Sequence, residues 1–344
     1  MSFNVIAMKG RPWIWALFLF VITSCRSDPS ESLRLHVFQG QTMGTSYRIS
    51  VVAGELDREA LQEDIQARLD RIDTLMSSWV STSDINRINS SDRDEPITVD
   101  PETAQVLNHS LSIADLTSGA FDISMSPLIE LWGFGTRDLE AFPQDDAIRE
   151  LLTQTGPGTF SVTGQTVTKL HPKVTLNVSA IAKGYAVDKV HELLTEKGFT
   201  DHLVEVGGEV FAAGISIHRK PWRVGLEAPD PVSRTPEVHQ VVRLSGMAVA
   251  TSGNYRNFFW HEGKQYTHII DPRTGYPIPS YVTSVSVIAK DCMSADAMAT
   301  ACMVLGVEAS LKLMEEVPDA ECMLVEEKDG KQLTHFSSGM GSYL

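Results

Sequence analysis

Cysteine and positive charge are both scarce in this sequence. The 344 residues include four cysteines, and none of them has the CxxC spacing of a thiolate metal site. Lysine and arginine total 29 against 44 aspartates and glutamates, which gives a net charge of −15. Because no basic stripe offsets this charge, it argues against nucleic acid as a partner. The net charge does not argue against a small anionic ligand held in a local pocket.

Several catalytic motifs are also missing. The sequence has no GxxxxGK[ST] phosphate loop, no GxSxG nucleophile elbow and no SxxK pair. The segment HELL at residue 191 lacks the second histidine of a zinc protease, because Thr195 stands in its place. No internal repeat or low-complexity tract appears. With 42% hydrophobic and 21% charged residues, the chain has the composition of one large or two modest globular domains.

The first 25 residues have the pattern of an export signal. Lys9 and Arg11 precede an apolar run, residues 13–22, which is shorter than the roughly 20 residues of a transmembrane helix. The run leads through small residues to Cys25 and resembles a bacterial lipoprotein signal, whose cysteine is lipidated. An ordinary secretory signal with a chance cysteine is the alternative. The expected parts are a signal peptide over residues 1–24, the lipidated cysteine with a short tether over 25–34, and a domain over 35–344.

Helices and strands mix along the remaining chain without strict alternation. Hydrophobic periodicity and capping residues predict helices over residues 55–76, 100–119, 141–152, 179–197 and 295–305, the last with Ser294 as cap and Gly306 as terminator. Strands are predicted within residues 37–52 and 159–170 and over 203–206, 210–213, 222–226, 246–251, 265–270 and 284–288. The predicted fold class is α+β, a single mixed α/β domain.

The segment QYTHIIDPRTGYP, residues 265–277, predicts a strand that carries a histidine into a sharp turn. Asp-Pro and Thr-Gly supply the turn chemistry. His268, Asp271 and Arg273 therefore lie together at a corner. A salt-bridged loop and the edge of an active site both fit this triplet.

Lys183 lies in a second notable segment, LNVSAIAKGYAVD, residues 176–188. A strand is predicted to lead into a helix here, and the free amides and dipole of a helix start favour an anion. A lysine in the first turn is disfavoured by the dipole, which a facing phosphate would offset. A solvent-facing lysine is the alternative.

Asp296 and Thr300 form a third constellation, in SADAMAT at residues 294–300. They are four residues apart and share one face of a predicted helix start. A carboxylate and a hydroxyl are hard oxygen donors that suit Mg²⁺. The alternative is a dipole-favoured aspartate beside a buried threonine.

Seven segments together resemble one family, the ApbE-type FAD:protein FMN transferases. They are QTMGTSYRI, GAFDISMSPLIELWGFG, SAIAKGYAVD, VEVGGEV, TSGNYRNFFW, YTHIIDPRTGYP and SADAMATACMVLG. They follow the family's order and lie within residues 37–306. The resemblance implies a single α/β domain with FAD in a central cleft.

The resemblance also implies an activity. Such enzymes use Mg²⁺ to cleave the pyrophosphate of FAD, transfer FMN to a threonine or serine hydroxyl of an acceptor protein, and release AMP. Their acceptors are membrane redox subunits with a Ser/Thr-Gly-Ala-Ser/Thr-like motif. The lipoprotein signal fits a lipid-anchored member of the bacterial cell envelope that faces the periplasm. A metal-dependent FAD pyrophosphatase and a non-catalytic flavin-binding lipoprotein are the alternatives.

The motif positions imply particular site residues. The metal would be held by Asp296, Thr300 and the carbonyl of Ala180. His268 is the expected general base, and Asp271 either orients it or holds the turn. The FAD site would be lined by Met43, Trp79, Ala120, Phe121, Asp122, Asn177, Lys183 and Ile270.

Two positions depart from the family pattern. Asn177 stands where the family usually has Asp, so a carboxylate near the flavin or metal is missing. The residues that follow Trp79 also differ from the usual ones, which makes Trp79 the least secure flavin contact.

Overall fold

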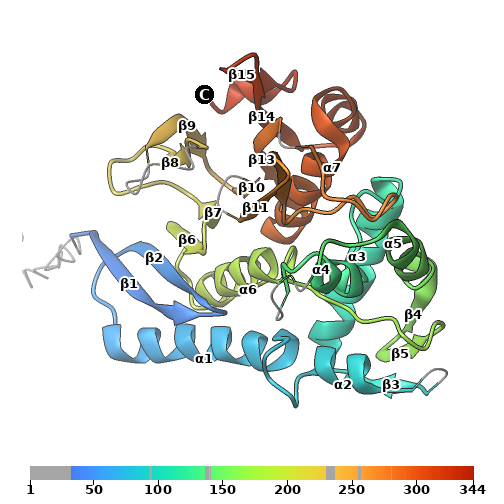
Figure 1. Ribbon diagram of the computed structural model, residues 1–344. Coiled ribbons are helices and arrows are strands. Elements are labelled where there is room, and N and C mark those ends of the chain that lie inside the picture. The colour runs from blue at the N-terminus through green and yellow to red at the C-terminus, as the bar shows by residue number, and fades with distance from the viewer. Residues whose placement is uncertain are drawn as a thin grey trace, which may run out of the picture. The chain divides into compact units, whose positions relative to one another are not determined.

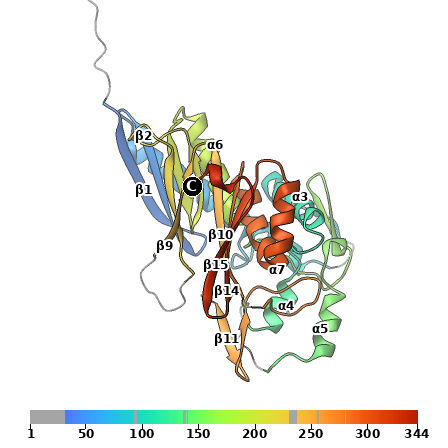
Figure 2. The same ribbon diagram turned by 90° about the horizontal axis from the view of Figure 1, so that it is seen from above.

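Eight strands form an antiparallel sheet in the order β1-β2-β6-β7-β10-β13-β14-β15 (Figures 1 and 2). The computed structural model describes residues 32–92, 95–135, 139, 141–229, 237–254, 257–279 and 281–344. Leu33–Leu344 form one compact unit. The predicted signal peptide and Cys25 lie outside the described residues. The strands of this sheet are β1 (Arg34–Thr42), β2 (Thr45–Ala53), β6 (His202–Val206), β7 (Glu209–Ala213), β10 (Met247–Gly253), β13 (Val282–Ala289), β14 (Glu321–Lys328) and β15 (Lys331–Phe336).

Helices and three small sheets complete the mixed α/β fold, as the sequence predicts. The small sheets are β3-β5-β4 (Ile97–Thr98, Thr166–Lys169, Phe160–Thr163), β8-β9 (Trp222–Glu227, Val238–Leu244) and β11-β12 (Phe258–His261, Lys264–Thr267). The helices are α1 (Arg58–Met76), α2 (Asp84–Ser90), α3 (Pro101–Leu116), α4 (Ser126–Leu131), α5 (Asp145–Leu152), α6 (Ala182–Glu196) and α7 (Cys292–Glu316), with short 3₁₀ turns at Pro157–Thr159 and Met340–Ser342.

The central strands are buried on both faces. In β7, Phe211 and Ala213 belong to the core cluster that also contains residues of α1, α6 and α7. Val210 and Ala212 belong to a second cluster, which also holds side chains of β8 and β9. Figure 2 shows α7 and β9 on opposite sides of the sheet. Because side chains alternate between the two faces of a strand, this double cover explains why β7 is apolar without alternation.

Helix α7 starts earlier than predicted. Its N-cap is Asp291 rather than Ser294, and the Asp291 side chain accepts a hydrogen bond from the Ser294 amide at 2.7 Å. At Gly306 the backbone leaves helical geometry (φ 78°, ψ −178°), so the predicted terminator separates two helical segments. By length and composition α7 would also suit a membrane span. It packs against β10, β13 and α6, however, and is the core helix of the domain.

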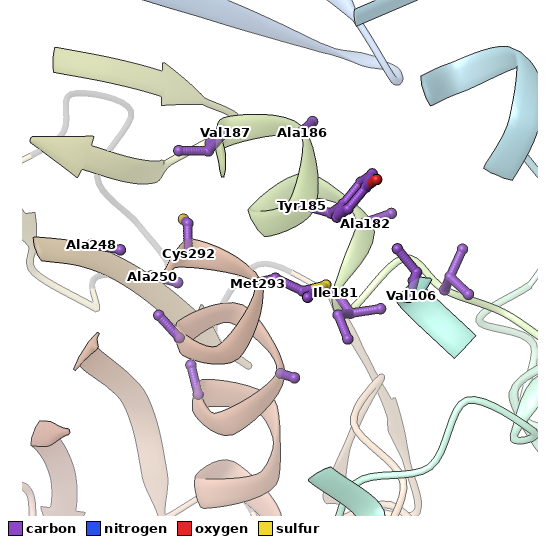
Figure 3. Close-up of a cluster of buried hydrophobic side chains, with 14 of the residues drawn as sticks. Val106, Ile181, Ala182, Tyr185, Ala186, Val187, Ala248, Ala250, Cys292 and Met293 are labelled. Carbon is purple, nitrogen blue, oxygen red and sulfur yellow. The ribbon is translucent and has the colours of Figure 1, made fainter. Parts of the chain in front are cut away.

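Helix α6 begins at Ala182, three residues later than predicted, and residues 171–181 before it contain no strand. Its first turn crosses α7 at Gly184. A Cβ added to Gly184 would lie 2.3 Å from the carbonyl oxygen of Cys292. Figure 3 shows the start of α6 beside Cys292 and Met293. The close approach of the two helices therefore requires glycine at this position.

The two helices cap each other. Asp188 of α6 accepts hydrogen bonds from the amides of Cys292, at 2.7 Å, and Met293, at 2.9 Å. Asp296 of α7 in turn accepts one from the Gly184 amide at 3.0 Å. First-turn amides have no partner within their own helix, so each carboxylate satisfies donors of the other helix. Burial raises the pKa of Asp188 to about 7, although the two amide hydrogen bonds oppose the rise.

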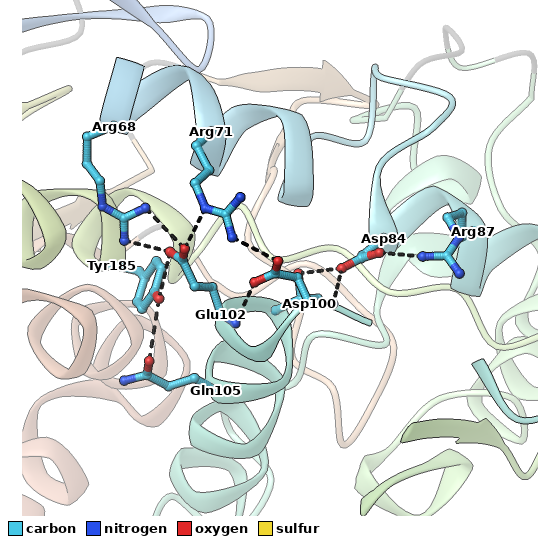
Figure 4. Close-up of polar contacts among 9 residues, drawn as sticks. Arg68, Arg71, Asp84, Arg87, Asp100, Glu102, Gln105 and Tyr185 are labelled. Carbon is cyan, nitrogen blue, oxygen red and sulfur yellow. Dashed lines mark hydrogen bonds and ion pairs between the residues drawn. The ribbon is translucent and has the colours of Figure 1, made fainter. Parts of the chain in front are cut away.

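An ion-pair network holds α6 against α1 and α3 (Figure 4). Glu102 of α3 pairs with Arg68 at 2.6 Å and Arg71 at 2.8 Å, both on α1, and accepts a hydrogen bond from the Tyr185 hydroxyl at 3.1 Å. Burial alone would raise the pKa of Glu102, but the two arginines and Tyr185 outweigh it and lower the pKa to about 2. Through Tyr185, which follows Gly184, the network holds the first turn of α6 in place.

We predict that Gly184→Ala lowers the free energy of unfolding by about 1–3 kcal/mol, because the new methyl group must push α6 and α7 apart. Chemical denaturation measures the change. Gly158→Ala is the matched control, since a Cβ there meets nothing within 4 Å and the site has no positive φ. Equal stability of the two variants would contradict the close crossing.

Candidate active site

A cavity of about 600 Å³ lies among α6, α7, β10 and the segment that follows β12. A neighbouring cavity of about 380 Å³ shares Asn177, Ser179 and Lys183 with it. Met43 and Trp79 line the smaller cavity, and Asp271 lines neither. The larger cavity brings together most of the predicted site residues: Ala120, Phe121, Asp122, Asn177, Ala180, Lys183, His268, Ile270, Asp296 and Thr300.

Lys183 is held between two carboxylates in the first turn of α6. Its ammonium donates to Glu209 Oε1 at 2.7 Å and lies 3.6 Å from Asp296 Oδ1. Burial lowers the pKa of Lys183, but Asp296 and Glu209 outweigh it and raise the pKa above its ordinary value. The lysine is therefore a partly exposed cation that two carboxylates hold on the cavity wall.

Glu209 is a site residue that the sequence interpretation missed. It opens β7, is only 3% exposed and lines the larger cavity. Burial and the nearby Asp296 raise its pKa, and the ion pair with Lys183 opposes this rise and favours the charged carboxylate. The available signal was an acidic residue in VEVGGEV, placed directly before a run of apolar strand residues where burial was to be expected.

Asp296 and Thr300 both line the larger cavity from α7, as their spacing predicts. Asp296 is buried, and the Thr300 hydroxyl lies 3.1 Å from the Ser252 hydroxyl. Ala180 lines the same cavity. The described residues contain no group of three or more His, Cys, Asp or Glu side chains that could hold a metal. One carboxylate with neutral oxygens nevertheless fits Mg²⁺, which keeps several waters and often binds through one or two carboxylates and substrate phosphates.

His268 lies one residue beyond β12, which ends at Thr267, so the strand predicted over residues 265–270 is shorter. Its Nδ1 is 3.1 Å from the Asn257 carbonyl oxygen. Because a carbonyl can only accept, Nδ1 carries the proton and Nε2 keeps a free lone pair. Burial lowers the pKa of His268, although the hydrogen bond to Asn257 opposes this change. The ring is therefore neutral at pH 7 and has the tautomer of a base.

Asp271 makes the contacts of a residue that holds the turn. Its carboxylate pairs with the Arg273 guanidinium at 2.8 Å and accepts from the Arg273 amide at 2.9 Å. Its backbone carbonyl accepts from the Gly275 amide at 2.8 Å. The expectation that Asp271 orients His268 is not met, because the observed partner of the imidazole Nδ1 is Asn257.

Asn177 and Asp122 are both engaged in local turns. Asn177 Oδ1 accepts from the Ser179 amide at 2.9 Å and from the Ser179 hydroxyl. Asp122 accepts from the Ser124 amide and hydroxyl, each at 2.8 Å. Burial raises the pKa of Asp122, although these hydrogen bonds oppose the rise. Both side chains shape the cavity wall through the loops they hold.

Met43 and Trp79, the predicted flavin contacts in the smaller cavity, differ in how tightly the fold constrains them. Met43 has a positive φ of 48° and forms, with Gly44 at φ 72°, the two-residue turn between β1 and β2. A bulky residue such as methionine rarely adopts a positive φ. Two-residue hairpin turns usually have glycine or asparagine at such a position. Trp79 is 80% exposed, in a position where a ligand could cover its ring.

Comparisons with known proteins agree on one family. The model described as the ApbE family matches residues 43–324. The chain is 35% identical to the FAD:protein FMN transferase of Vibrio cholerae over 323 residues, which cover 93% of this chain and 95% of the relative. It is 34% identical to the FAD:protein FMN transferase of Escherichia coli K12 over 336 residues, with 95% and 94% covered.

Solved structures give the same result. The flavin transferase ApbE from Vibrio cholerae matches with a TM-score of 0.82 at 32% identity and covers 91% of this chain and 100% of that one. The apo form of Pseudomonas stutzeri flavinyl transferase ApbE also has a TM-score of 0.82 at 32% identity, with 90% and 96% covered. The mixed α/β fold is thus the fold of these enzymes.

Proposed function

The chain belongs to the ApbE family, and on this premise we propose that it is a FAD:protein FMN transferase. It moves the FMN half of FAD to a threonine or serine hydroxyl of an acceptor protein and releases AMP. The observation that carries this proposal is the convergence of Lys183, Asp296 and His268 on one cavity. They supply a cation for phosphate, a carboxylate for a metal and a neutral base.

The two adjoining cavities suit an extended dinucleotide. Their shared wall contains Lys183 at the start of α6. A lysine and a helix N-terminus both attract phosphate, so the pyrophosphate belongs at this wall. The two ends of FAD would then extend into the two cavities. Phe121, Phe134 and Ile270 give the larger one an apolar wall for a ring system.

Asp296, Thr300 and the carbonyl of Ala180 would hold the Mg²⁺. When bound, the ion would neutralise charge on the phosphates and on the departing AMP. In this position Asp296 has two roles, because its Oδ2 also accepts the Gly184 amide hydrogen bond. The same carboxylate therefore joins the metal site to the crossing of α6 and α7.

His268 would act as the general base. Nε2 takes the proton of the acceptor hydroxyl, whose oxygen attacks the phosphorus of the FMN half. A new P–O bond forms to the acceptor, and the bond from this phosphorus to the bridging oxygen breaks, so that AMP leaves with that oxygen. Asn257 holds the imidazole through Nδ1, 3.1 Å away, and keeps Nε2 available.

Release of AMP from FAD tests the function. Purified protein is incubated with FAD and Mg²⁺, with and without a candidate acceptor subunit that carries a Ser/Thr-Gly-Ala-Ser/Thr-like motif. The proposal predicts release that depends on the acceptor. Release without acceptor would identify a FAD pyrophosphatase, and no release in either sample would identify a flavin-binding protein without turnover.

We further propose that the protein is lipid-anchored in the bacterial cell envelope, faces the periplasm and modifies a subunit of a membrane redox complex. The support is the basic, apolar and small-residue pattern of residues 1–24 before Cys25. Anchoring would keep the enzyme beside membrane-bound acceptors.

Cys25→Ser should move the protein from the membrane to the soluble fraction of cells. The lost acyl chains contribute about 0.8 kcal/mol for each buried CH₂ group. Fractionation followed by immunoblotting measures the shift. Unchanged membrane association of the variant would rule out lipidation at Cys25.

His268→Ala should lower the rate of FMN transfer about 10²- to 10⁴-fold while FAD affinity changes little. His218→Ala, an exposed histidine outside the cavity, is the control and should keep full activity. The wild-type rate should fall only as the pH drops below about 6.5, the ordinary histidine value, because the pKa of His268 is lowered and only its neutral form accepts a proton. Weak FAD binding with a normal rate at saturation would instead assign His268 to binding.

Loss of the charge of Asp296 and loss of the hydroxyl of Thr300 should have different effects. Asp296→Asn keeps an oxygen for the Gly184 amide but removes the only charged donor proposed for Mg²⁺, so activity should be lost at ordinary Mg²⁺. Thr300→Val should be partly rescued by added Mg²⁺, because water can replace one neutral ligand.

AMP release measured against Mg²⁺ concentration distinguishes these outcomes. Asp319→Asn is the control, because Asp319 forms a surface ion pair with Lys290 and should not alter the Mg²⁺ requirement. Normal turnover by Asp296→Asn across the whole series would exclude the proposed metal site.

A further inference from the structure

Glu209 is a buried carboxylate with one unused oxygen. Its Oε1 accepts the hydrogen bond from Lys183, whereas its Oε2 is buried and finds no hydrogen-bond donor among the described residues. The side chain is only 3% exposed and lines the larger cavity. Leaving a buried carboxylate oxygen without a hydrogen bond costs free energy, so the position calls for a function.

The backbone around Glu209 is shaped to reach Lys183. Val206 and Glu209 pair across the two-residue turn Gly207–Gly208, whose φ angles of 60° and 100° suit glycine. A Cβ on Gly207 would lie 3.3 Å from Lys183 Cδ and 2.9 Å from Thr45 Cγ2. The turn thus leaves space for the aliphatic part of the Lys183 side chain and places the Glu209 carboxylate beside the Lys183 ammonium.

Two carboxylates, those of Glu209 and Asp296, lie near the ammonium of Lys183. The ammonium forms a hydrogen bond with Glu209 at 2.7 Å, while Asp296 Oδ1 is 3.6 Å away, within ion-pair range but outside hydrogen-bond distance. The lysine side chain is flexible and carries three donors. Without the charge of Glu209, the ammonium would move onto Asp296, the carboxylate that remains.

We propose that Glu209 is a positioning residue that holds the ammonium of Lys183 out of hydrogen-bond contact with Asp296 and so leaves Asp296 Oδ1 available to the divalent cation. This inference rests on the proposed function, in which Asp296 binds Mg²⁺. An ammonium paired with Asp296 would compete with the cation for the same oxygen and would also turn away from the phosphates. Glu209 acts on the cation through Lys183 and does not ligate it.

Titration calorimetry with Mg²⁺ tests this inference without turnover. Four proteins are compared in the absence of FAD: wild type, Glu209→Gln, Lys183→Met and the double variant. Glu209→Gln should weaken Mg²⁺ binding about 10-fold or more, as loss of a residue that supports a metal ligand typically does. In the Lys183→Met background the same substitution should have little effect, because no ammonium is left to compete.

Glu209→Asp is the conservative control. It keeps the negative charge that attracts the ammonium, so it should retain most of the Mg²⁺ affinity. Thermal melting of each variant shows whether it is folded. If Glu209→Gln does not fold, Glu209→Asp carries the test, because a 10-fold loss of Mg²⁺ affinity in a variant that keeps the charge would contradict the inference.

Three outcomes would overturn the inference. Equal weakening by Glu209→Gln in both backgrounds would mean that Glu209 acts on the cation directly. Unchanged Mg²⁺ binding by Glu209→Gln, with normal binding by wild type, would remove the inference but leave the proposed function intact. Failure of the wild-type protein to bind Mg²⁺ would remove the proposed metal site and this inference with it.

Discussion

The structure depends on the mutual capping of α6 and α7. Asp188 accepts hydrogen bonds from the first two amides of α7, and Asp296 accepts one from an amide in the first turn of α6. The two helices can make these contacts only because Gly184 lets their backbones approach. Helix ends that are buried away from water need such partners, since an unpaired buried amide costs about 1–3 kcal/mol.

This crossing also creates the site. With α6 and α7 capped by each other, Lys183 and Asp296 lie on one cavity wall although 113 positions separate them in the sequence. The β6–β7 turn adds Glu209, and the segment after β12 adds His268. Asp296 is both a cap and the proposed metal ligand. The stability of the helix pair and the chemistry of the cavity are therefore linked through one carboxylate.

The sequence predicted the elements that have a local cause. Asp100 and Pro101 do open α3, the β4–β5 hairpin forms within residues 159–170, and Gly306 interrupts α7 as its position suggested. Capping was harder to assign at α7, because Asp291 and Ser294 are both good cap residues. The structure uses Asp291, and the Ser294 hydroxyl lies instead 3.0 Å from His109 Nε2.

The features that the sequence could not provide depend on tertiary contacts. Gly184 looks like a residue that weakens a helix until Cys292 is placed against it. Glu209 looks like the polar end of a strand until Lys183 reaches it. Asp271 had two potential partners within three residues, and only the folded turn shows that Arg273 is the one it binds. His268, Lys183, Asp296 and Thr300 were identified as site residues because their segments resemble a family, and the cavity places them together.

Native-state hydrogen exchange tests the mutual capping most directly. The amides of Gly184, Cys292 and Met293 should exchange only through global unfolding, with the same free energy of opening as the whole domain. The Gly208 amide also donates to a carboxylate, that of Glu205 at 2.8 Å, but it is exposed and should exchange through local opening. If the three capping amides exchanged as readily as Gly208, the helix pair would not be the element on which the fold and the site depend.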